Sequence, residues 1–559
     1  MSKIQKLELT WVGKDEKEEI EPRILVENPE LSHVYNRDKN GQLSLINKDG
    51  DFDNMLIHGD NLLALKALEQ DFADKVKCIY IDPPYNANAT NVPFDDNLEH
   101  SFYLDLMRSR IAILRNLMAS NGIFCMQCDY NEMAYLKVLC DEVFGRNNYI
   151  TMITIKTSSE SGVKVNANKP AKVSEYMLMY AKNKDEIVYK TIRIPTGYDK
   201  NYSYYVENIQ DSYSDWKFSN VKDVLSKELN KDKQELTDEE LREFQIRNKN
   251  RVFSVRDISD TLKQFLKVNS IDKSKIYEYK TSTGKITLLL KNGEVVFVKN
   301  KVFNIDGKEE LTKIASDIWV DISWDGIANE GGVVLKNSKK PEKLIKRILD
   351  AYTNEGDIVL DSFLGSGTTC AVAHKMKRKW IGIEMGEHAY SLAKVRMDAV
   401  INGDQTGISK SVNWQGGGSY KFYELAPSLV IKDSHGYDII NPEYNANMLA
   451  AAMAKHEGFK YNPDRNNAYK QGFASEKSFI FTTTNHITAE YLDEIASNFA
   501  DDEYLIINCK SFDGNIVNNY RNITIKKIPQ SILGKCVFNK DNYNLNIINL
   551  PAEDDNAEK

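Results

Sequence analysis

The sequence predicts an α/β fold with a mostly parallel sheet covered by helices on both faces, and three observations support this prediction. Short apolar runs alternate with amphipathic segments along residues 51–190 and again along residues 316–422, which is typical of strands that alternate with helices. Two of the runs end in loops rich in proline or glycine, and in open α/β sheets ligands gather beyond the carboxyl ends of strands. Between the two halves, residues 191–315 are rich in Lys, Tyr, Asn and Ser and break the alternation.

In the first half we expect strands at residues 55–58, 78–81, 123–126, 149–155 and 176–180, and helices at 62–68, 98–120 and 131–144. Asp60 or Asn61 is available as the N-cap of the first helix. The second helix is the clearest, because its apolar residues recur at steps of three and four and share one face: Tyr103, Met107, Ile111, Leu114 and Met118. Asn121 and Gly122 are expected to end this helix.

In the second half we expect helices at residues 339–352, 367–377 and 388–400, and strands at 357–361 and 380–384. The glycines after Trp414 mark a boundary, so residues 423–559 are expected to form a further αβ unit with strands at 479–483 and 504–509. Residues 1–50 are polar and weakly periodic, and they are interpreted as an N-terminal arm.

Residues 191–315 are expected to form a separate inserted domain with two local signals of its own. Thr237 and Glu240 form a capping box, flanked by Leu236 and Leu241 as a hydrophobic staple. Residues 286–290 and 294–298 are expected to form a hairpin joined at Asn292 and Gly293, a preferred turn dipeptide.

Composition excludes several classes of protein. The net charge of −8 counts against indiscriminate coating of nucleic acid, although it permits a local basic cleft. No run of about 20 apolar residues and no secretory signal is found, so no membrane span is expected. Seven scattered cysteines, an odd number, indicate a reducing compartment, and we expect the cytoplasm. Cys125 and Cys128 lack a second pair at zinc spacing, so we interpret them as small residues of an apolar strand and expect no metal.

The first motif is the run of Asp82, Pro83, Pro84, Tyr85 and Asn86 after an apolar strand. The prolines restrict the backbone and remove donors, leaving carbonyls free as acceptors. An acid, an acceptor carbonyl and an aromatic ring suit a planar base with an exocyclic amine: Tyr85 could stack on it, and Asp82 with the Pro83 carbonyl could accept the amine hydrogens. Taken alone, this run could be only a turn.

The second motif, residues 361–369, lies between a strand and a helix. Gly365 and Gly367 let the backbone approach a ligand closely, and the start of the helix favours a carboxylate or phosphate. Glu384 ends the next strand, where an acid typically takes ribose hydroxyls. A P-loop lysine is missing after Gly367, but taken alone the loop also fits a dinucleotide site. Because both motifs end strands, we expect Asp82 and Gly365 to lie in one cleft.

Together these residues resemble the amino-methyltransferases of DNA, and specifically their permuted β class. In that class the Asp-Pro-Pro-Tyr motif precedes the Phe-x-Gly-x-Gly cofactor motif, and a target-recognition domain lies between them. The chain is most similar to the modification subunits of type III restriction–modification systems, with supporting stretches at residues 57–65, 326–332, 339–341 and 414–418. Leu364, where the family often has Ala, and Ala87-Asn88, where it often has Thr-Gly, depart from the pattern.

The resemblance implies a circularly permuted Rossmann-like methyltransferase core with five parts: residues 1–50, 51–190, 191–315, 316–422 and 423–559. It implies S-adenosyl-L-methionine as the methyl donor and N6 of a flipped-out adenine in double-stranded DNA as the acceptor. The implied catalytic residues are Asp82, Pro83, Pro84 and Tyr85. The implied cofactor-binding residues are Asp60, Asp361, Phe363, Gly365, Ser366, Gly367, Thr368 and Glu384, with Asp60 at the cofactor's adenine and Glu384 at its ribose.

Contacts to DNA are expected within residues 191–315. Six cationic residues could contact phosphates or base edges, although a solvated surface is the alternative for each: Arg247, Lys249, Arg251, Arg256, Lys263 and Lys267. Four tyrosines could either stack on bases or belong to a core: Tyr198, Tyr202, Tyr204 and Tyr205.

The resemblance also implies a homodimer and an ATP-dependent restriction subunit as a partner. Alternatives remain open, namely a solitary adenine methyltransferase, an N4-cytosine methyltransferase, an RNA-base or protein-glutamine methyltransferase, or a non-catalytic DNA-recognition subunit. Cytosine enzymes of this class tend to carry Ser where Asp82 stands, and the RNA-base and protein-glutamine enzymes tend to carry Asn, so Asp82 favours adenine.

Overall fold

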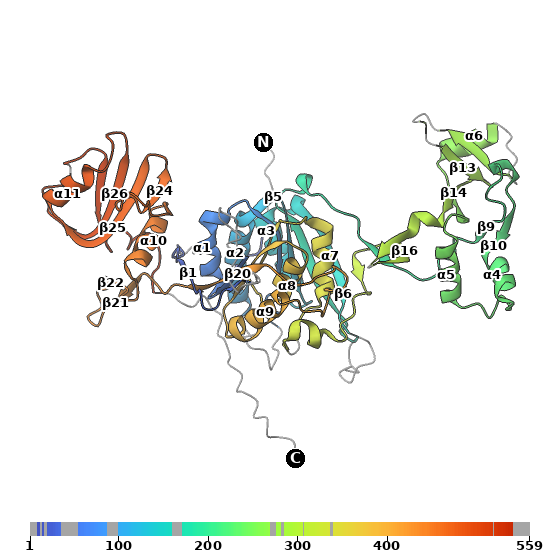
Figure 1. Cartoon of the computed structure of the whole chain (residues 1–559), viewed down its shortest axis with the longest axis horizontal. Helices are drawn as coiled ribbons and strands as arrows, with labels where there is room; N and C mark the ends of the chain where they lie inside the picture. Colours follow the sequence, from blue (N-terminus) through green and yellow to red (C-terminus); the bar gives the residue numbers. More distant parts are fainter. Residues whose placement is uncertain are drawn as a thin grey trace, which may run out of the picture. The chain divides into compact units, whose positions relative to one another are not determined.

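The computed structural model (Figure 1) describes residues 8–11, 14–15, 19–34, 54–86, 99–158, 170–268, 275–280, 284, 286–305, 307–335, 339–517 and 519–539. The chain divides into two compact units, unit 1 (Met1–Lys190 with Asp317–Lys559) and unit 2 (Thr191–Ser316). No helix in the described part of the chain is long and apolar enough to cross a membrane. Ala87-Asn88, which depart from the family pattern, lie outside the described residues.

A large mixed sheet of eleven strands forms the centre of unit 1, in the order β1-β20-β3-β19-β18-β4-β5-β7-β6-β17, with β2 paired to β20. Its strands are β1 (Leu25–Glu27), β2 (His33–Val34), β3 (Asn54–His58), β4 (Val76–Ile81), β5 (Met118–Cys128), β6 (Tyr149–Lys156), β7 (Ser174–Ala181), β17 (Ile318–Trp319), β18 (Ile358–Asp361), β19 (Lys379–Glu384) and β20 (Ser419–Leu425). Neighbours from β20 to β5 are parallel, whereas β7 is antiparallel to β5 and β6. The predicted α/β fold is confirmed.

The two halves of the core are interleaved in space. β4 comes early in the chain and β18 follows unit 2, yet they are parallel neighbours, with Cys78 opposite Val359 and Ile79 opposite Leu360. Both therefore deliver their carboxyl ends to the same edge of the sheet. This pairing confirms the permuted, doubly wound core.

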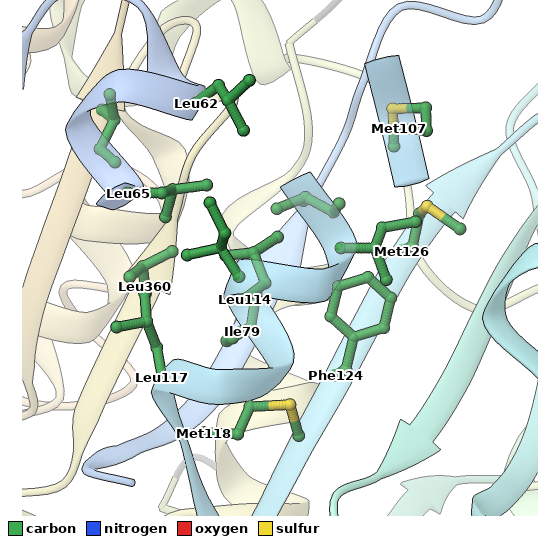
Figure 2. Close-up of a cluster of buried hydrophobic side chains, with 14 of the residues drawn as sticks. Leu62, Leu65, Ile79, Met107, Leu114, Leu117, Met118, Phe124, Met126 and Leu360 are labelled. Carbon is green, nitrogen blue, oxygen red and sulfur yellow. The ribbon is translucent and has the colours of Figure 1, made fainter. Parts of the chain in front are cut away.

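The helices of the core are α1 (Asn61–Phe72), α2 (His100–Leu117), α3 (Met133–Phe144), α7 (Glu342–Tyr352), α8 (Thr368–Lys375) and α9 (Val395–Ile401). Figure 2 shows α1 and α2 packed on the sheet, with Leu65 and Leu114 beside Ile79, Phe124 and Leu360. All five side chains are fully buried, and each such burial contributes about 1.5–3 kcal/mol. This core holds β4, which carries the first motif, against β18, which carries the second.

The expected end of the second helix is wrong. α2 ends at Leu117, and Met118 already belongs to β5, so Asn121 and Gly122 lie within a strand rather than at a helix end. The pairing of β4 with β5 shifts register there, and a Cβ on Gly122 would lie 2.8 Å from the Ala119 carbonyl oxygen. Glycine is therefore required by an irregular strand, not by a cap.

The expected helix at 388–400 is not uniform, because residues Ala389–Lys394 form a π-helix before α9. The expected helix at 339–352 starts late, at Glu342. Lys340 precedes Pro341, and a residue before proline is disfavoured in the α region. Lys340 is therefore left in the extended segment before α7, beside the first motif.

Unit 2 contains a six-stranded sheet, β10-β9-β11-β14-β13-β12, and a three-stranded sheet, β15-β16-β8, with antiparallel pairs throughout. Its elements are β8 (Arg193–Pro195), β9 (Tyr204–Val206), β10 (Phe218–Asn220), α4 (Val221–Leu229), α5 (Asp238–Arg247), β11 (Val252–Asp257), α6 (Asp260–Val268), β12 (Tyr277–Lys280), β13 (Ile286–Leu290), β14 (Gly293–Phe297), β15 (Val302–Ile305) and β16 (Lys308–Ile314).

The local signals of unit 2 are largely found. The capping box of Thr237 and Glu240 is confirmed at α5. The predicted hairpin forms, but its turn is Lys291 and Asn292, with φ of 54° and 79°, whereas Gly293 already pairs with Leu290. A Cβ at Gly293 would lie 2.6 Å from the Arg256 carbonyl oxygen, so this glycine is required by the close approach of β11 rather than by the turn.

The C-terminal part of unit 1 has a second sheet, β23-β24-β25-β26-β27, in which β25, β26 and β27 are parallel. Its elements are β21 (Val430–Lys432), β22 (Asp438–Ile440), α10 (Ala446–His456), β23 (Lys460–Tyr461), β24 (Gly472–Ser475), β25 (Ser478–Ile487), α11 (Ala489–Ala496), β26 (Tyr504–Phe512) and β27 (Ile523–Lys527). The boundary placed between residues 422 and 423 falls inside β20, which pairs with β3 as far as Glu424. Likewise, β1 from the expected N-terminal arm pairs with β20 and extends the main sheet.

Candidate active site

The loops that follow β4 and β18 meet at one cavity of about 950 Å³, its open mouth included. Asp82 and Gly365 both line it, so the predicted shared cleft is confirmed. The predicted site residues that line the cavity are Asp82, Pro84, Asp361, Phe363, Gly365, Ser366, Thr368 and Glu384.

Four predicted site residues are not among those that line the cavity. Asp60 caps α1, accepting from the Leu63 N–H at 3.0 Å, and its other oxygen lies 3.2 Å from Arg110 Nη2. Its neighbour Asn61 lines the cavity instead. Gly367 precedes α8 with φ of 80°, and a Cβ there would lie 3.3 Å from Ala393 Cα. Pro83 is buried and Tyr85 is half-buried beside Asp82.

The Asp82 carboxylate is held by two neighbours. Lys340 Nζ lies 2.9 Å from Oδ2, and the Tyr85 hydroxyl lies 2.8 Å from Oδ1. Burial raises the pKa of Asp82 above its ordinary value, and Lys340 only partly offsets this effect. Asp82 is therefore an unusually basic carboxylate in the wall of a cavity.

Sequence reasoning missed two residues of this site, Glu175 on β7 and Lys340 before α7. The Tyr85 hydroxyl lies 2.8 Å from Glu175 Oε2 and 3.0 Å from Lys340 Nζ. Gln127 on β5 donates to Glu175 and accepts from the Tyr80 hydroxyl at 2.6 Å. Lys340 had a signal, because it belongs to the Lys-Lys-Pro stretch that supports the family resemblance, whereas Glu175 had none.

The glycine loop is fixed by two carboxylates. Asp361 accepts from the Phe363 N–H at 2.9 Å and from the Thr369 hydroxyl at 2.6 Å. Burial raises the pKa of Asp361 to about 7. Glu384 accepts from the Gly365 N–H at 2.7 Å and the Gly386 N–H at 3.2 Å, and burial raises its pKa. The loop that Gly365 turns is thus tied to the end of β19.

A group of buried charges supports the same loop from behind. We call Glu342, Lys375, Arg396 and Asp404 the Glu342 cluster; Glu342 lies 2.8 Å from Arg396 and 3.0 Å from Lys375, which lies 3.0 Å from Asp404. Arg396 also donates to the Thr368 hydroxyl at 2.7 Å. The sequence did not reveal this cluster, because charges on helices are usually solvated.

The cavity suits a ligand that is partly apolar and rich in donors or positive charge. Its wall combines the carboxylates of Asp82, Asp361 and Glu384 with apolar side chains such as Phe363 and Ile383. The Ser362 hydroxyl also lines it and, among the described residues, has no hydrogen-bond partner. Within the described residues, no group of three His, Cys, Asp or Glu side chains could hold a metal ion.

The six predicted DNA-contacting residues all belong to unit 2, and five have partners within it. Arg247, Lys249 and Lys263 pair with carboxylates. Arg251 and Arg256 donate to the hydroxyls of Tyr205 and Tyr202 at 3.0 and 2.6 Å. Lys267 is exposed on α6. The four tyrosines that were ambiguous belong to or pack on the hydrophobic clusters of this unit.

Known proteins share these features. The model of the N6/N4 DNA methylase family matches residues 76–395. The probable type III restriction–modification enzyme HindVI Mod subunit of Haemophilus influenzae is 35% identical over 67% of this chain and 54% of its own length. The type III enzyme EcoP15I Mod subunit of Escherichia coli is 24% identical over 78% of this chain and 73% of its own. The type II methyltransferase M.EcaI of Enterobacter cloacae is 27% identical over 72% of this chain and 81% of its own length.

The chain spans about half the length of the HindVI relative. The family match covers both motif loops, the strands that carry them and the whole of unit 2 between them. The chain therefore belongs to the DNA methylase family.

Proposed function

We propose that this protein transfers a methyl group from S-adenosyl-L-methionine to N6 of adenine in double-stranded DNA, as the modification subunit of a type III restriction–modification system. One observation carries this proposal: the Asp82 motif and the Gly365 loop line a single cavity. The names of the HindVI and EcoP15I relatives support the type III assignment.

The cavity residues fit S-adenosyl-L-methionine. The unpartnered Ser362 hydroxyl and the Glu384 carboxylate offer polar contacts, and Phe363 and Ile383 offer an apolar surface for a purine ring. The start of α8 carries no side-chain cap, so its N–H groups favour a carboxylate. The bound cofactor supplies a methyl group on a sulfonium, and the carboxylates at the cavity suit that positive charge.

The Asp82 motif would prepare the target amine. The lone pair of the amine nitrogen is delocalised into the ring of the base. Hydrogen bonds from the two amine hydrogens to Asp82 and the Pro83 carbonyl favour a pyramidal nitrogen, which can attack the methyl group in line. Asp82 stabilises the positive charge that develops on the nitrogen, and the rigid prolines hold both acceptors in place. The Pro84 carbonyl is already occupied by the Tyr103 hydroxyl at 2.9 Å, which leaves the acceptor role to Pro83.

The target base must leave the duplex to reach this site, with Tyr85 as the proposed stacking partner. Unit 2 lies between the two motifs in the chain, and we propose that it recognises DNA, with Lys267, Arg251 and Arg256 among its contacts. In the proposed system the protein forms a homodimer and pairs with an ATP-dependent restriction subunit.

Asp82→Ala tests the proposed chemistry. With labelled cofactor and unmethylated genomic DNA, we expect the variant to lose at least about 10²-fold in methyl transfer, because it loses an acceptor used in the transition state. Calorimetry should show nearly unchanged binding of S-adenosyl-L-methionine. Equal loss of transfer and binding would contradict the role of Asp82, and sequencing of the modified bases distinguishes N6-adenine from N4-cytosine as the target.

A further inference from the structure

The Tyr85 hydroxyl occupies an unusual position between two acids. Its oxygen lies 2.8 Å from Asp82 Oδ1 and 2.8 Å from Glu175 Oε2, and Lys340 Nζ lies 3.0 Å away. Lys340 also reaches Asp82 Oδ2 at 2.9 Å and Glu175 Oε2 at 3.6 Å. All three neighbours of the hydroxyl therefore belong to one connected group.

A count of protons shows what this geometry requires. A tyrosine hydroxyl has one hydrogen to donate, and an ionised carboxylate has none. Tyr85 can therefore donate to only one of the two acids, and the other contact at 2.8 Å is attractive only if that acid carries a proton and donates it to the tyrosine oxygen. The lone pairs of that oxygen accept this proton and one from Lys340.

The surroundings indicate which acid carries the proton. Burial raises the pKa of Asp82. Burial alone would also raise the pKa of Glu175, but Lys340, Tyr85 and Gln127 together lower it below its ordinary value. The arrangement that satisfies every contact has Asp82 donating to Tyr85 and Tyr85 donating to ionised Glu175.

We propose that Glu175 is a positioning residue for methyl transfer, which acts through the Tyr85 hydroxyl to stabilise the protonated form of Asp82. This inference rests on the proposed function. As the bond from nitrogen to the methyl carbon forms and the sulfur–carbon bond breaks, the amine nitrogen becomes positively charged. The step starts from the ionised form of Asp82: the amine proton passes to the Asp82 carboxylate, which then donates to the tyrosine oxygen while Tyr85 donates to Glu175, so that the charge on the nitrogen is removed and the arrangement with protonated Asp82 is restored.

Asp82 is also influenced by the other elements packed around it. The titratable groups that face it are Lys340 before α7, Glu175 on β7, Tyr80 on β4, Cys128 on β5, Asp361 on β18, and Tyr85. Among them, Lys340 and Glu175 act on Asp82 with opposite signs. Removing the charge of Glu175 leaves Lys340 paired with Asp82 alone, which lowers the pKa of Asp82 in the same direction as the loss of support through Tyr85.

Glu175→Gln tests this role, with Glu424→Gln as the matched control. Glu424 on β20 accepts from the Tyr390 hydroxyl at 2.9 Å in the same sheet, but it is not connected to Asp82. We expect Glu175→Gln to lower the maximal rate on the order of tenfold and to move the acid limb of the kcat–pH profile down by about one pH unit or more. Binding of S-adenosyl-L-methionine and the Glu424→Gln profile should match those of the unchanged protein.

Tyr85→Phe provides a second route if Glu175→Gln fails to fold. It should move the acid limb in the same direction, and the double variant should move it no further than Glu175→Gln alone, because the contact that runs through Tyr85 is already broken there. Infrared titration of the cofactor-free protein, with the band of protonated Asp82 assigned by Asp82→Asn, should show a lower midpoint in both variants. Acid limbs and midpoints that coincide with those of the unchanged protein would overturn the inference. Absence of any DNA methylation by the unchanged protein would instead refute the proposed function, while the infrared midpoints would still decide the role of Glu175.

Discussion

Glu342→Ala should cause a large loss of stability in unit 1, because it removes the centre of the Glu342 cluster. Glu342, Lys375 and Arg396 are all buried. The carboxylate accepts from Lys375 at 3.1 and 3.0 Å, from Arg396 at 2.8 Å and from the Ile408 N–H at 3.0 Å. Lys375 keeps Asp404 as a partner after the change. Arg396 loses Glu342, the one carboxylate with which it pairs among the described residues.

The expected cost follows from the burial of the cations. Removing one partner of a buried ion pair typically costs about 3–5 kcal/mol, because a charge is left uncompensated in the interior. Unit 1 has 433 residues, and for a folding unit of this size 1 kcal/mol corresponds to about 1 °C, so the thermal midpoint should fall by roughly 3–5 °C. Arg396 also holds the Thr368 hydroxyl, so affinity for S-adenosyl-L-methionine should fall as well.

Scanning calorimetry of the full-length protein measures the midpoint, and titration calorimetry measures the affinity. Asp502→Ala is the matched control, because Asp502 pairs with Lys477 on the surface, where both side chains are more than half exposed, and such pairs contribute little. If Glu342→Ala shifted the midpoint no more than this control does, the reasoning about the buried cluster would be wrong.

Two further predictions concern the glycine loop. Gly367→Ala should lower the free energy of unfolding by roughly 1–2 kcal/mol, because Gly367 has φ of 80° and a left-handed conformation has this cost for a non-glycine residue. It should also lower the cofactor affinity several-fold, because an added Cβ would lie 3.3 Å from Ala393 Cα. Gly436→Ala, also at positive φ but with open space around it, controls for the conformational cost in denaturant melts, and an equal loss of cofactor affinity in both would contradict close packing at Gly367. Asp361, with its pKa raised to about 7, binds its proton more tightly in the folded protein than in the unfolded chain. Its contribution to the free energy of unfolding is therefore complete below about pH 4 and is lost as the pH rises through 7. Urea titrations across this range should show that the free energy of unfolding falls less in Asp361→Asn than in the unchanged protein. An equal fall in both proteins would mean that another group causes it.

The core and both motif loops could be predicted because their signals are local. A buried strand followed by prolines or glycines marks β4 and β18 in one short stretch each, and the carboxyl ends of parallel strands meet at one edge. These signals therefore predict that Asp82 and Gly365 lie in one cleft, although they carry no information on the distance between them. The role of Asp60 at the cofactor stays a prediction; in the structure its carboxylate caps α1 and contacts Arg110.

The rest of the site depends on contacts that no local pattern reveals. Glu175 and Lys340 lie 90 and 255 residues from Tyr85 in the chain. The pairing of β4 with β5 and of β5 with β7 brings Glu175 close to Asp82. The irregular strand at Gly122 and the π-helix before α9 were missed for a related reason. Each adds about one residue to the regular repeat of its helix or strand, and a hydrophobic pattern analysed at a fixed period cannot detect such an insertion.

The pairing of β4 with β18 determines when the central sheet can close during synthesis. β4 leaves the ribosome early, but the strand that covers one of its edges follows only after the whole of unit 2 has been translated. Until then, Cys78 and Ile79 have an unpaired flank, and an open strand edge recruits other chains. Nascent chains that stop within unit 2 would therefore carry the Asp82 motif on an incomplete sheet. The two halves of the core thus complete their folding together rather than one after the other.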